Sequence, residues 1–242
     1  MKKAAMNTKP YSERVKVKRV PTRGQYDRET IYRIVDQAFM CHVGFSRGEH
    51  VSVIPMVYWR KDNHLYLHGS TASGLMRLLA SGVEACISIT VLDGLVFSRS
   101  AFHHSANYRS VVLYAVGQPV SDAAEKVELF EHFFQVLSPG RWEALREPNA
   151  KELKATAVLA FDLSEASAKI RTGGPVDDEA DYQLPVWAGV VPLALSSGEV
   201  ISDGRLAPGT VVPRNLEAYR LLGVTALVQP ERGPLEREAV VV

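Results

Sequence analysis

Three polar stretches of this sequence could do chemistry, and the first runs from His68 to Ser73. It stands between a predicted strand and a predicted helix, and it consists mainly of hydroxyl residues and glycine. Free amides and the helix dipole at such a terminus attract anions, so this stretch predicts a phosphate site. The alternative is that Ser70 or Ser73 only caps the helix.

The second stretch, residues 98–110, contains two adjacent histidines and two arginines. On an extended chain His103 and His104 point to opposite faces, so they do not readily share one metal ion. A catalytic zinc needs three converging protein ligands, and the sequence has neither H-E-x-x-H nor paired C-x-x-C. We therefore expect no metal site. Arg109 opens an apolar strand and needs an anionic partner, either a phosphate or a carboxylate.

The third stretch, residues 184–193, places Trp187 between two prolines. A tryptophan there can lay its ring over a ligand or a partner subunit, and the alternative is an ordinary core tryptophan. The sequence has no G-x-G-x-x-G, no P-loop and no G-x-S-x-G. A bound phosphate would therefore be held by a structural element other than a Rossmann or P-loop turn.

The elements that must position these stretches are mostly strands. Hydrophobic spacing and capping residues predict helices over 27–39, 73–80 and 122–137. Alternating and β-branched runs predict strands over 41–45, 51–59, 64–68, 84–92, 95–98, 108–116, 155–163 and 168–171. Asp93-Gly94 predicts a turn between two of them, and Pro55 predicts an edge or a bulge. Tight turns between most strands favour a small antiparallel barrel with a few packed helices.

Composition narrows the class of protein. The 242 residues are 46% hydrophobic and 23% charged with net charge +1, which is ordinary globular usage without a nucleic-acid or membrane-binding field. The first twenty residues are locally basic and predict a solvated tail, or alternatively an arm lying on a partner subunit. Cys41 and Cys86 predict buried reduced thiols. With no signal peptide or membrane-length apolar run, we expect a cytoplasmic protein.

Taken in order, these motifs resemble the pyridoxamine 5′-phosphate oxidase-like flavin-binding split-barrel family, in particular its flavin-nucleotide-binding and nitroimidazole-resistance-related group. The resemblance runs from Tyr26 to Pro213 and rests on the order of a capped helix, a split hairpin and four short motifs. They are Leu67–Ser70, Leu92–Val96, His103–Val111 and Trp187–Leu193.

The resemblance implies a mainly β fold with some α+β character. The expected architecture is a six-stranded antiparallel Greek-key split β-barrel with flanking helices. It also implies a homodimer with flavin mononucleotide (FMN) between the subunits. The net charge and the lack of a membrane-length apolar run predict no nucleic-acid or membrane partner. The implied organisation is a basic N-terminal arm over 1–25, the flavin-binding barrel over 26–213 and a C-terminal extension over 214–242.

The resemblance assigns cofactor-binding roles to particular residues. The strand that would lie against the isoalloxazine edge contains Val53, Ile54, Pro55 and Met56. The strand-to-helix step that would hold the phosphate contains His68, Ser70 and Ser73. A later strand would hold the phosphate and the ribityl chain through Asn107, Tyr108, Arg109 and Ser110, and Trp187 of the tail would shield the ring.

One departure from the family separates this chain from the vitamin B6 oxidases. Those relatives carry Arg-Lys just after the phosphate-binding serine, where this chain has Gly74 and Leu75. Arg77 and Arg109 would then supply the positive charge. The same change makes flavin adenine dinucleotide (FAD) an alternative to FMN.

The expected function is therefore that of a flavin-dependent oxidoreductase or reductase of a small planar substrate, with NADH or NADPH as a possible donor. It is not expected to be a true pyridoxamine-phosphate oxidase. The first alternative is a flavin carrier or sensor without turnover. A second alternative replaces flavin with haem, with His68, His103 or His104 as axial ligand.

Overall fold

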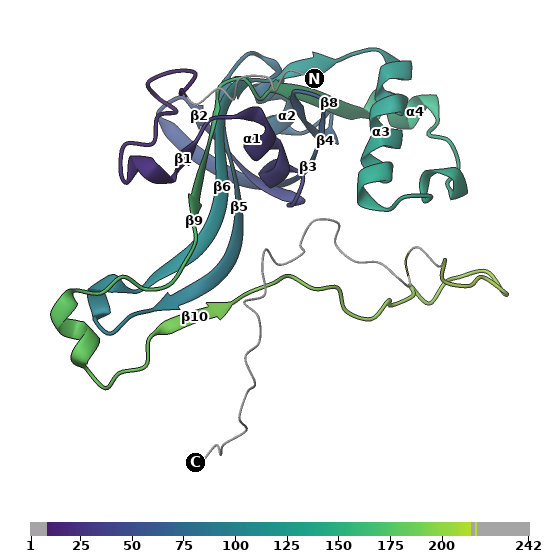
Figure 1. Ribbon diagram of the computed structural model, residues 1–242. Helices are drawn as coiled ribbons and strands as arrows, with labels where there is room; N and C mark the ends of the chain where they lie inside the picture. Colours follow the sequence, from purple (N-terminus) through teal and green to yellow (C-terminus); the bar gives the residue numbers. More distant parts are fainter. Residues whose placement is uncertain (1–8, 214–215, 217–242) are drawn as a thin grey trace, which may run out of the picture.

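The computed structural model describes residues 9–213 and 216, and the strands among them form one large antiparallel sheet (Figure 1). The strand order is β1-β9-β6-β5-β2-β3-β4-β8-β7, with β10 on the other edge of part of β5. The strands are β1 Gly24–Gln25, β2 Met40–Arg47, β3 His50–Lys61, β4 His64–Ser70, β5 Glu84–Phe97, β6 Ser105–Val116, β7 Gln118–Val120, β8 Thr156–Asp162, β9 Ala166–Arg171 and β10 Gly189–Pro192.

Four α-helices and four short 3-10 turns flank this sheet in the described residues. They are η1 Pro21–Arg23, α1 Arg28–Val35, α2 Gly74–Ala80, η2 Ala101–His103, α3 Ala123–Leu137, η3 Trp142–Ala144, α4 Ala150–Ala155 and η4 Glu179–Gln183. The predicted mainly β, antiparallel architecture is confirmed. The described sheet has ten strands, so the predicted count of six is not confirmed.

Helix α1 begins where the sequence predicts and ends earlier. The Asp27 side chain accepts a hydrogen bond from the Thr30 amide at 2.8 Å, and the helix buries Ile31, Ile34 and Val35. The predicted helix ran to residue 39, but the chain already enters β2 at Met40. The Phe39 carbonyl already accepts a hydrogen bond from the Tyr58 amide of β3, and ladder pairing starts at Met40, so the end of the predicted helix is taken up by the approach to the sheet.

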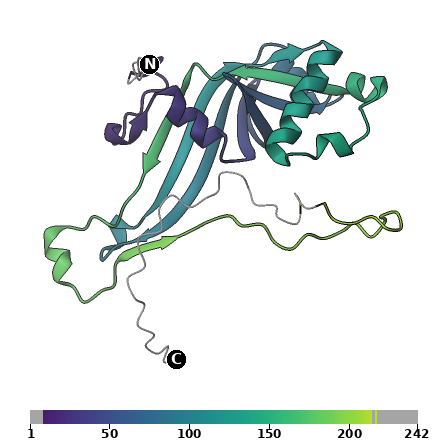
Figure 2. The same cartoon turned by 45° about the vertical axis from the view of Figure 1, so that its right-hand side comes forward.

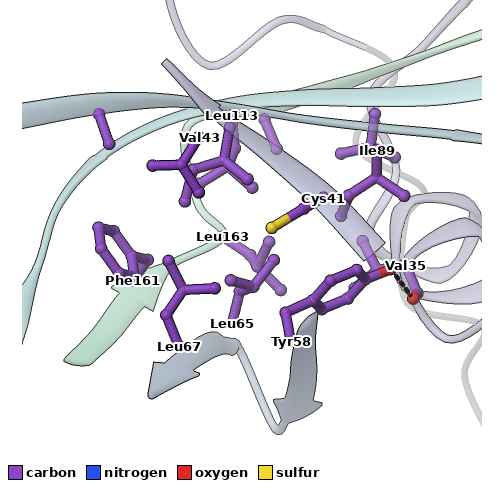
Figure 3. Close-up of a cluster of buried hydrophobic side chains, with 14 of the residues drawn as sticks. Val35, Cys41, Val43, Tyr58, Leu65, Leu67, Ile89, Leu113, Phe161 and Leu163 are labelled. Carbon is purple, nitrogen blue, oxygen red and sulfur yellow. Dashed lines mark hydrogen bonds between the residues drawn. The ribbon is translucent and has the colours of Figure 1, made fainter. Parts of the chain in front are cut away.

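The barrel core is formed by side chains of β2, β4, β5, β6 and β8, together with Tyr58 from the second half of β3 (Figure 3). Cys41 of β2 is fully buried there as a free thiol, and burial raises its pKa to about 12. Cys86 is also a free thiol and is partly buried. A second apolar cluster lies beneath α3, where Trp59 stacks on Tyr66 and also contacts Phe133.

The predicted turn at Asp93-Gly94 is wrong, because β5 continues through these residues as one strand with a β-bulge. Aspartate followed by glycine suits a bulge as well as a hairpin turn. A Cβ on Gly94 would lie 2.9 Å from the carbonyl oxygen of Val191, so glycine is what allows β10 to pair here. As a result β5 and β6 leave the barrel as a long curved ribbon with β10 near its far end (Figure 2).

The N-terminal arm, from residue 9 onward, packs on its own sheet. Arg14 forms ion pairs with Glu84 and Glu165 and lies over the ring of Tyr114, while Val15 is buried. These contacts differ from the expected solvated tail, and the alternative, a contact with a partner subunit, stays a prediction. Apart from Leu216, the predicted extension 214–242 lies outside the described residues.

Across the described part of the chain, none of the helices combines the length and the apolar character needed to cross a bilayer.

Candidate functional site

Half of β3 forms an open edge of the sheet. Residues 51–57 pair with β2 on one side, but β4 pairs only with residues 58–61 on the other. Backbone amides and carbonyls of the first half are therefore free on that side among the described residues, and Pro55 lies on this edge as predicted. Val53 is 58% exposed and lies opposite Gly44, whereas Ile54 lies opposite the buried Val43.

The strand-to-helix step stands after β4. Ser73 caps α2 by accepting a hydrogen bond from the Met76 amide at 3.4 Å, and Ser70 accepts one from the Ala72 amide at 3.1 Å. Only Ser73 thus makes the capping contact that was the alternative to phosphate binding, while the Ser70 hydroxyl closes the short turn before α2. A capped serine still has a second lone pair for a ligand donor.

Arg47 supplies the positive charge that the sequence lacks after Ser73. It comes from the β2–β3 hairpin, and its Nη2 lies 3.4 Å from the place where a Cβ on Gly74 would be. Arg47 is exposed and has no polar partner among the described residues. Sequence reasoning missed it because a hairpin brings it to α2 from a distant position. Glycine at position 74 keeps the space that this guanidinium needs.

The structure does not bring the His68 side chain to this step, where the resemblance placed it near a phosphate. Its ring packs among Trp59, Phe130 and Phe133 beneath α3. Burial lowers the pKa of His68, so the neutral imidazole is favoured. Its Nδ1 and the Nε1 of Trp59 are both buried without a hydrogen-bond partner in the described structure.

The predicted group Asn107–Ser110 lies in the first half of β6 and contacts its own chain. Arg109 binds Asp93 through Nε at 2.8 Å and Nη2 at 2.6 Å, which is the carboxylate alternative considered for it. Its Nη1 is buried without a partner in the described structure. Asn107 accepts a hydrogen bond from Arg171 and donates one to the Gly173 carbonyl.

Trp187 lies at the far end of the ribbon, just before β10. Ser88 of β5 lies level with Pro55 of β3, because both pair with His42 of the strand between them. Gly189 pairs with Phe97, nine residues further along β5 than Ser88, so at ordinary strand rise Trp187 is about 30 Å from the β3 edge. One protomer therefore does not bring together all the predicted cofactor residues.

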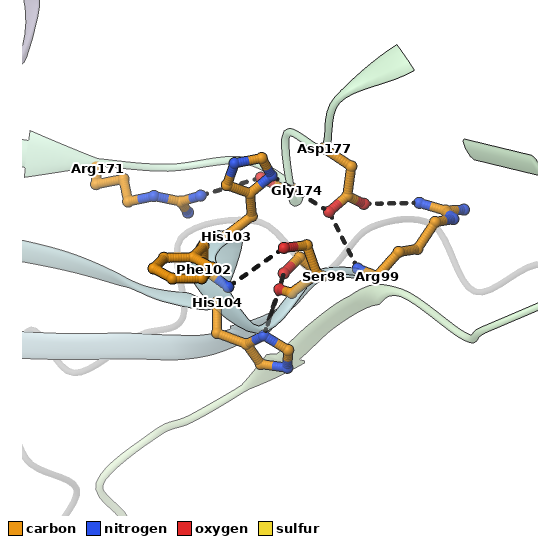
Figure 4. A network of polar contacts seen from close by, with 9 residues as sticks. Ser98, Arg99, Phe102, His103, His104, Arg171, Gly174 and Asp177 are labelled. Atoms are coloured by element: carbon orange, nitrogen blue, oxygen red, sulfur yellow. Dashed lines mark hydrogen bonds and ion pairs between the residues drawn. The ribbon is translucent and has the colours of Figure 1, made fainter. Parts of the chain in front are cut away.

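A polar network occupies the far end of the ribbon (Figure 4). The side chain of Asp177 has no exposed surface and accepts hydrogen bonds from the Arg99 amide and the Arg99 guanidinium, both at 3.0 Å. Burial alone would raise the pKa of Asp177, but the Arg99 hydrogen bonds outweigh it and hold the pKa below the usual range. Arg99 also lies over the ring of Tyr182.

His104 has a defined hydrogen-bonding arrangement within this network. Its Nδ1 lies 3.0 Å from the Ser100 carbonyl oxygen and 3.1 Å from the Ser98 hydroxyl. Since a carbonyl oxygen only accepts, the proton sits on Nδ1 and the lone pair of Nε2 is free in the neutral ring. The ring meets Phe97 edge-on, and Phe97 in turn contacts Trp187. Figure 4 shows His103 on the other side of the chain.

The outer face of the sheet beside the β3 edge carries an open groove of about 440 Å³. Its walls come from β2, β3, β5 and β6 and combine apolar side chains with a few polar ones. Prominent among them are His42, Val51, Val53, Cys86, Ser88 and Tyr114.

The family model described as pyridoxamine 5′-phosphate oxidase matches residues 27–170 of this chain. The flavocytochrome Anf3 from Azotobacter vinelandii is 40% identical, with a TM-score of 0.82, and the match covers 86% of this chain and 96% of that one. The FAD and haem binding protein from Mycobacterium smegmatis is 32% identical, with a TM-score of 0.78, and the match covers 82% of this chain and 98% of that one.

A more distant structural relative shares the fold. A protein from Bacteroides thetaiotaomicron named for 5-nitroimidazole antibiotic resistance is 19% identical with a TM-score of 0.52, over 61% of this chain and 86% of that one. Among curated proteins, none matches this chain.

Proposed function

Because this chain belongs to the pyridoxamine 5′-phosphate oxidase family, we propose that it is a flavin nucleotide-binding protein that works as a homodimer. The observation that carries the proposal is the placement of Arg47 at Gly74, beside the free edge of β3. A guanidinium and a flat polar edge suit the two ends of a flavin nucleotide. The relative from M. smegmatis is named for FAD, which supports FAD as well as FMN.

In this arrangement the chain binds and orients, and the flavin when bound supplies hydride and electron transfer. Backbone groups of residues 53–56 hydrogen-bond the polar rim of the ring. Arg47 and Arg77 approach the phosphate, with the Ser73 hydroxyl as a further contact. The apolar side chains of the groove exclude water from one side of the ring.

A second copy of the chain completes the proposed site. Large apolar side chains are exposed along the β3 edge, at the far end of the ribbon and on the segment after β10; examples are Val51 at 77%, Phe102 at 96% and Trp187 at 67%. Exposed apolar surface on this scale marks an interaction site. Because Trp187 lies far from its own β3 edge, the proposed shielding ring is the partner's Trp187. Light scattering of flavin-loaded protein tests this, and a monomer that retains flavin would refute it.

The identity of the cofactor is tested by mass spectrometry of the small molecule released on denaturing the purified protein. A reductase of small planar substrates and a carrier or sensor then differ in one measurement. NADH or NADPH bleaches the flavin of a reductase, and an added acceptor is consumed over many turnovers. A flavin that stays oxidised with both donors, or is reduced without acceptor turnover, favours the carrier or sensor.

Haem binding is a second candidate function, and a specific observation favours His104 as its axial ligand. Histidines that bind metals commonly donate their other N–H to a backbone carbonyl, as His104 does to Ser100. His68 is enclosed by aromatic rings instead. The two relatives named as a flavocytochrome and as an FAD and haem binding protein support a joint flavin and haem content. A Soret band that is lost in His104→Ala and kept in His68→Phe is the expected result, and the reverse pattern would refute the assignment.

A further inference from the structure

Three side chains with metal-binding atoms converge at the far end of the ribbon. They are His103 at the end of η2, Asp178 at the N-cap of η4 and Asp181 within η4. One ligand atom from each lies within 4.8 Å of the other two. No local metal motif joins these residues, because they come from segments 75 residues apart and only one of the two adjacent histidines takes part.

The carboxylates of this group lack a compensating cation. Asp177 beside them is neutralised by Arg99, but no arginine or lysine among the described residues pairs with Asp178 or Asp181. Two neighbouring carboxylates repel each other unless a positive charge lies between them. The two carboxylates therefore carry a negative charge that a divalent cation would balance.

Further contacts hold the three side chains in position. The Asp181 amide donates to the Asp178 carbonyl at 2.9 Å, which fixes the turn between the two carboxylates. His103 Nδ1 is buried without a hydrogen-bond partner in the described structure, and it lies 3.7 Å from Oδ1 of the fully buried Asp177. Asp177 thus stands beside the imidazole in the carboxylate–histidine arrangement that orients metal-binding histidines.

We propose that His103, Asp178 and Asp181 bind a zinc-class divalent cation. An imidazole with two carboxylates suits Zn²⁺, while Ca²⁺ and Mg²⁺ favour oxygen-only shells of six or more ligands. Three protein ligands leave a coordination position for water. The ion ties residues 178–181 to the β5–β6 connection and thereby restrains the segment that leads to Trp187.

The test is calorimetric titration of tag-free, full-length protein, first stripped of metal with a chelator, with Zn²⁺ and separately with Mg²⁺. The wild type is expected to bind one Zn²⁺ per chain and Mg²⁺ at least tenfold more weakly. The double variant Asp178→Asn/Asp181→Asn is expected to lose at least tenfold in Zn²⁺ affinity. Asparagine keeps the shape of the side chains, and thermal melting checks that the variant is folded.

Glu179→Gln is the matched control, because it removes a carboxylate from the same 3-10 turn without touching the proposed ligands. It is expected to bind Zn²⁺ like the wild type. His103→Gln provides an independent variant and is expected to lose affinity as the double variant does. Stoichiometric Zn²⁺ binding that is equal in all variants, equal affinity for Mg²⁺, or no binding by the wild type would each overturn the proposal.

Discussion

Arg109 of β6 and Asp93 of β5 are joined by two parallel hydrogen bonds across the β-bulge. The ladder pairs Arg109 with Val91, so the guanidinium reaches diagonally to the carboxylate next to Gly94. Arg109 is 5% exposed, whereas 27% of the Asp93 side chain is exposed. The pair therefore holds the bulge in place at the point where the ribbon leaves the barrel.

Removing one member of this pair is expected to destabilise the protein. Arg109→Ala leaves the Asp93 carboxylate without its partner, and the expected loss is about 2–4 kcal/mol in the free energy of unfolding. Urea denaturation of wild type, Arg109→Ala, Asp93→Asn and the double variant measures the coupling. Additive losses would show that the pair does not stabilise the fold.

The unpaired Nη1 of Arg109 still allows a contact with the cofactor. Under conditions in which the variants remain folded, Arg109→Ala is expected to retain less flavin than Arg99→Ala, whose guanidinium is engaged by Asp177. Equal retention would assign Arg109 to the structure of the bulge alone.

Local signals predicted most of the elements. Asp27, Ser73 and Asp122 each cap a helix at the residue where the sequence places its start. The edge position of Pro55 also followed from its missing N–H. The bulge was missed because Asp93-Gly94 has the same chemistry in a turn and in a bulge, and only pairing with β6 decides between them.

The site depended on contacts that no local pattern contains. Arg47 reaches Gly74 only because a hairpin folds back onto α2, and His68 turns away because α3 covers that side of β4. Convergence of His103 with Asp178 likewise depends on the path of the chain around the far end of the ribbon. The sequence could predict which residue types matter, but not which of them meet.

Arg47→Ala is expected to weaken flavin binding more than Arg77→Ala. The guanidinium of Arg47, from the end of β2, lies beside Gly74 at the start of α2, whereas Arg77 is one turn further along that helix. Loss of a charge-assisted contact to phosphate of about 1.5–3 kcal/mol corresponds to roughly a 10- to 150-fold rise in Kd. Titration of apoprotein with flavin, followed by quenching of flavin fluorescence, measures both variants. A larger effect of Arg77→Ala would place the phosphate elsewhere.

Because of His68, the free energy of unfolding is expected to fall as the solution becomes more acidic. Burial lowers its pKa in the folded protein, while the unfolded chain titrates near pH 6.5. The unfolded state therefore binds more protons below that pH, and stability falls as the pH drops from about 7.5 to 5.5. His68→Phe is expected to flatten this dependence in urea denaturation series. His50→Gln, at an exposed hairpin position, controls for removing a histidine, and an unchanged slope in His68→Phe would contradict the prediction.

Oxidation of pyridoxamine 5′-phosphate is not expected, even in flavin-saturated protein. Such a reaction needs one cationic site for the flavin phosphate and a second for the phosphate of the substrate. Arg47 serves the first in the proposed arrangement, since Gly74 and Leu75 replace the family's Arg-Lys pair. Arg99 and Arg109 are already engaged by Asp177 and Asp93, so neither offers a full guanidinium to a second phosphate. Desolvating a phosphate dianion without such a partner is costly, and the ester should bind poorly. Pyridoxal-phosphate formation and oxygen consumption measure the reaction, and robust turnover would show that another cationic site serves the substrate.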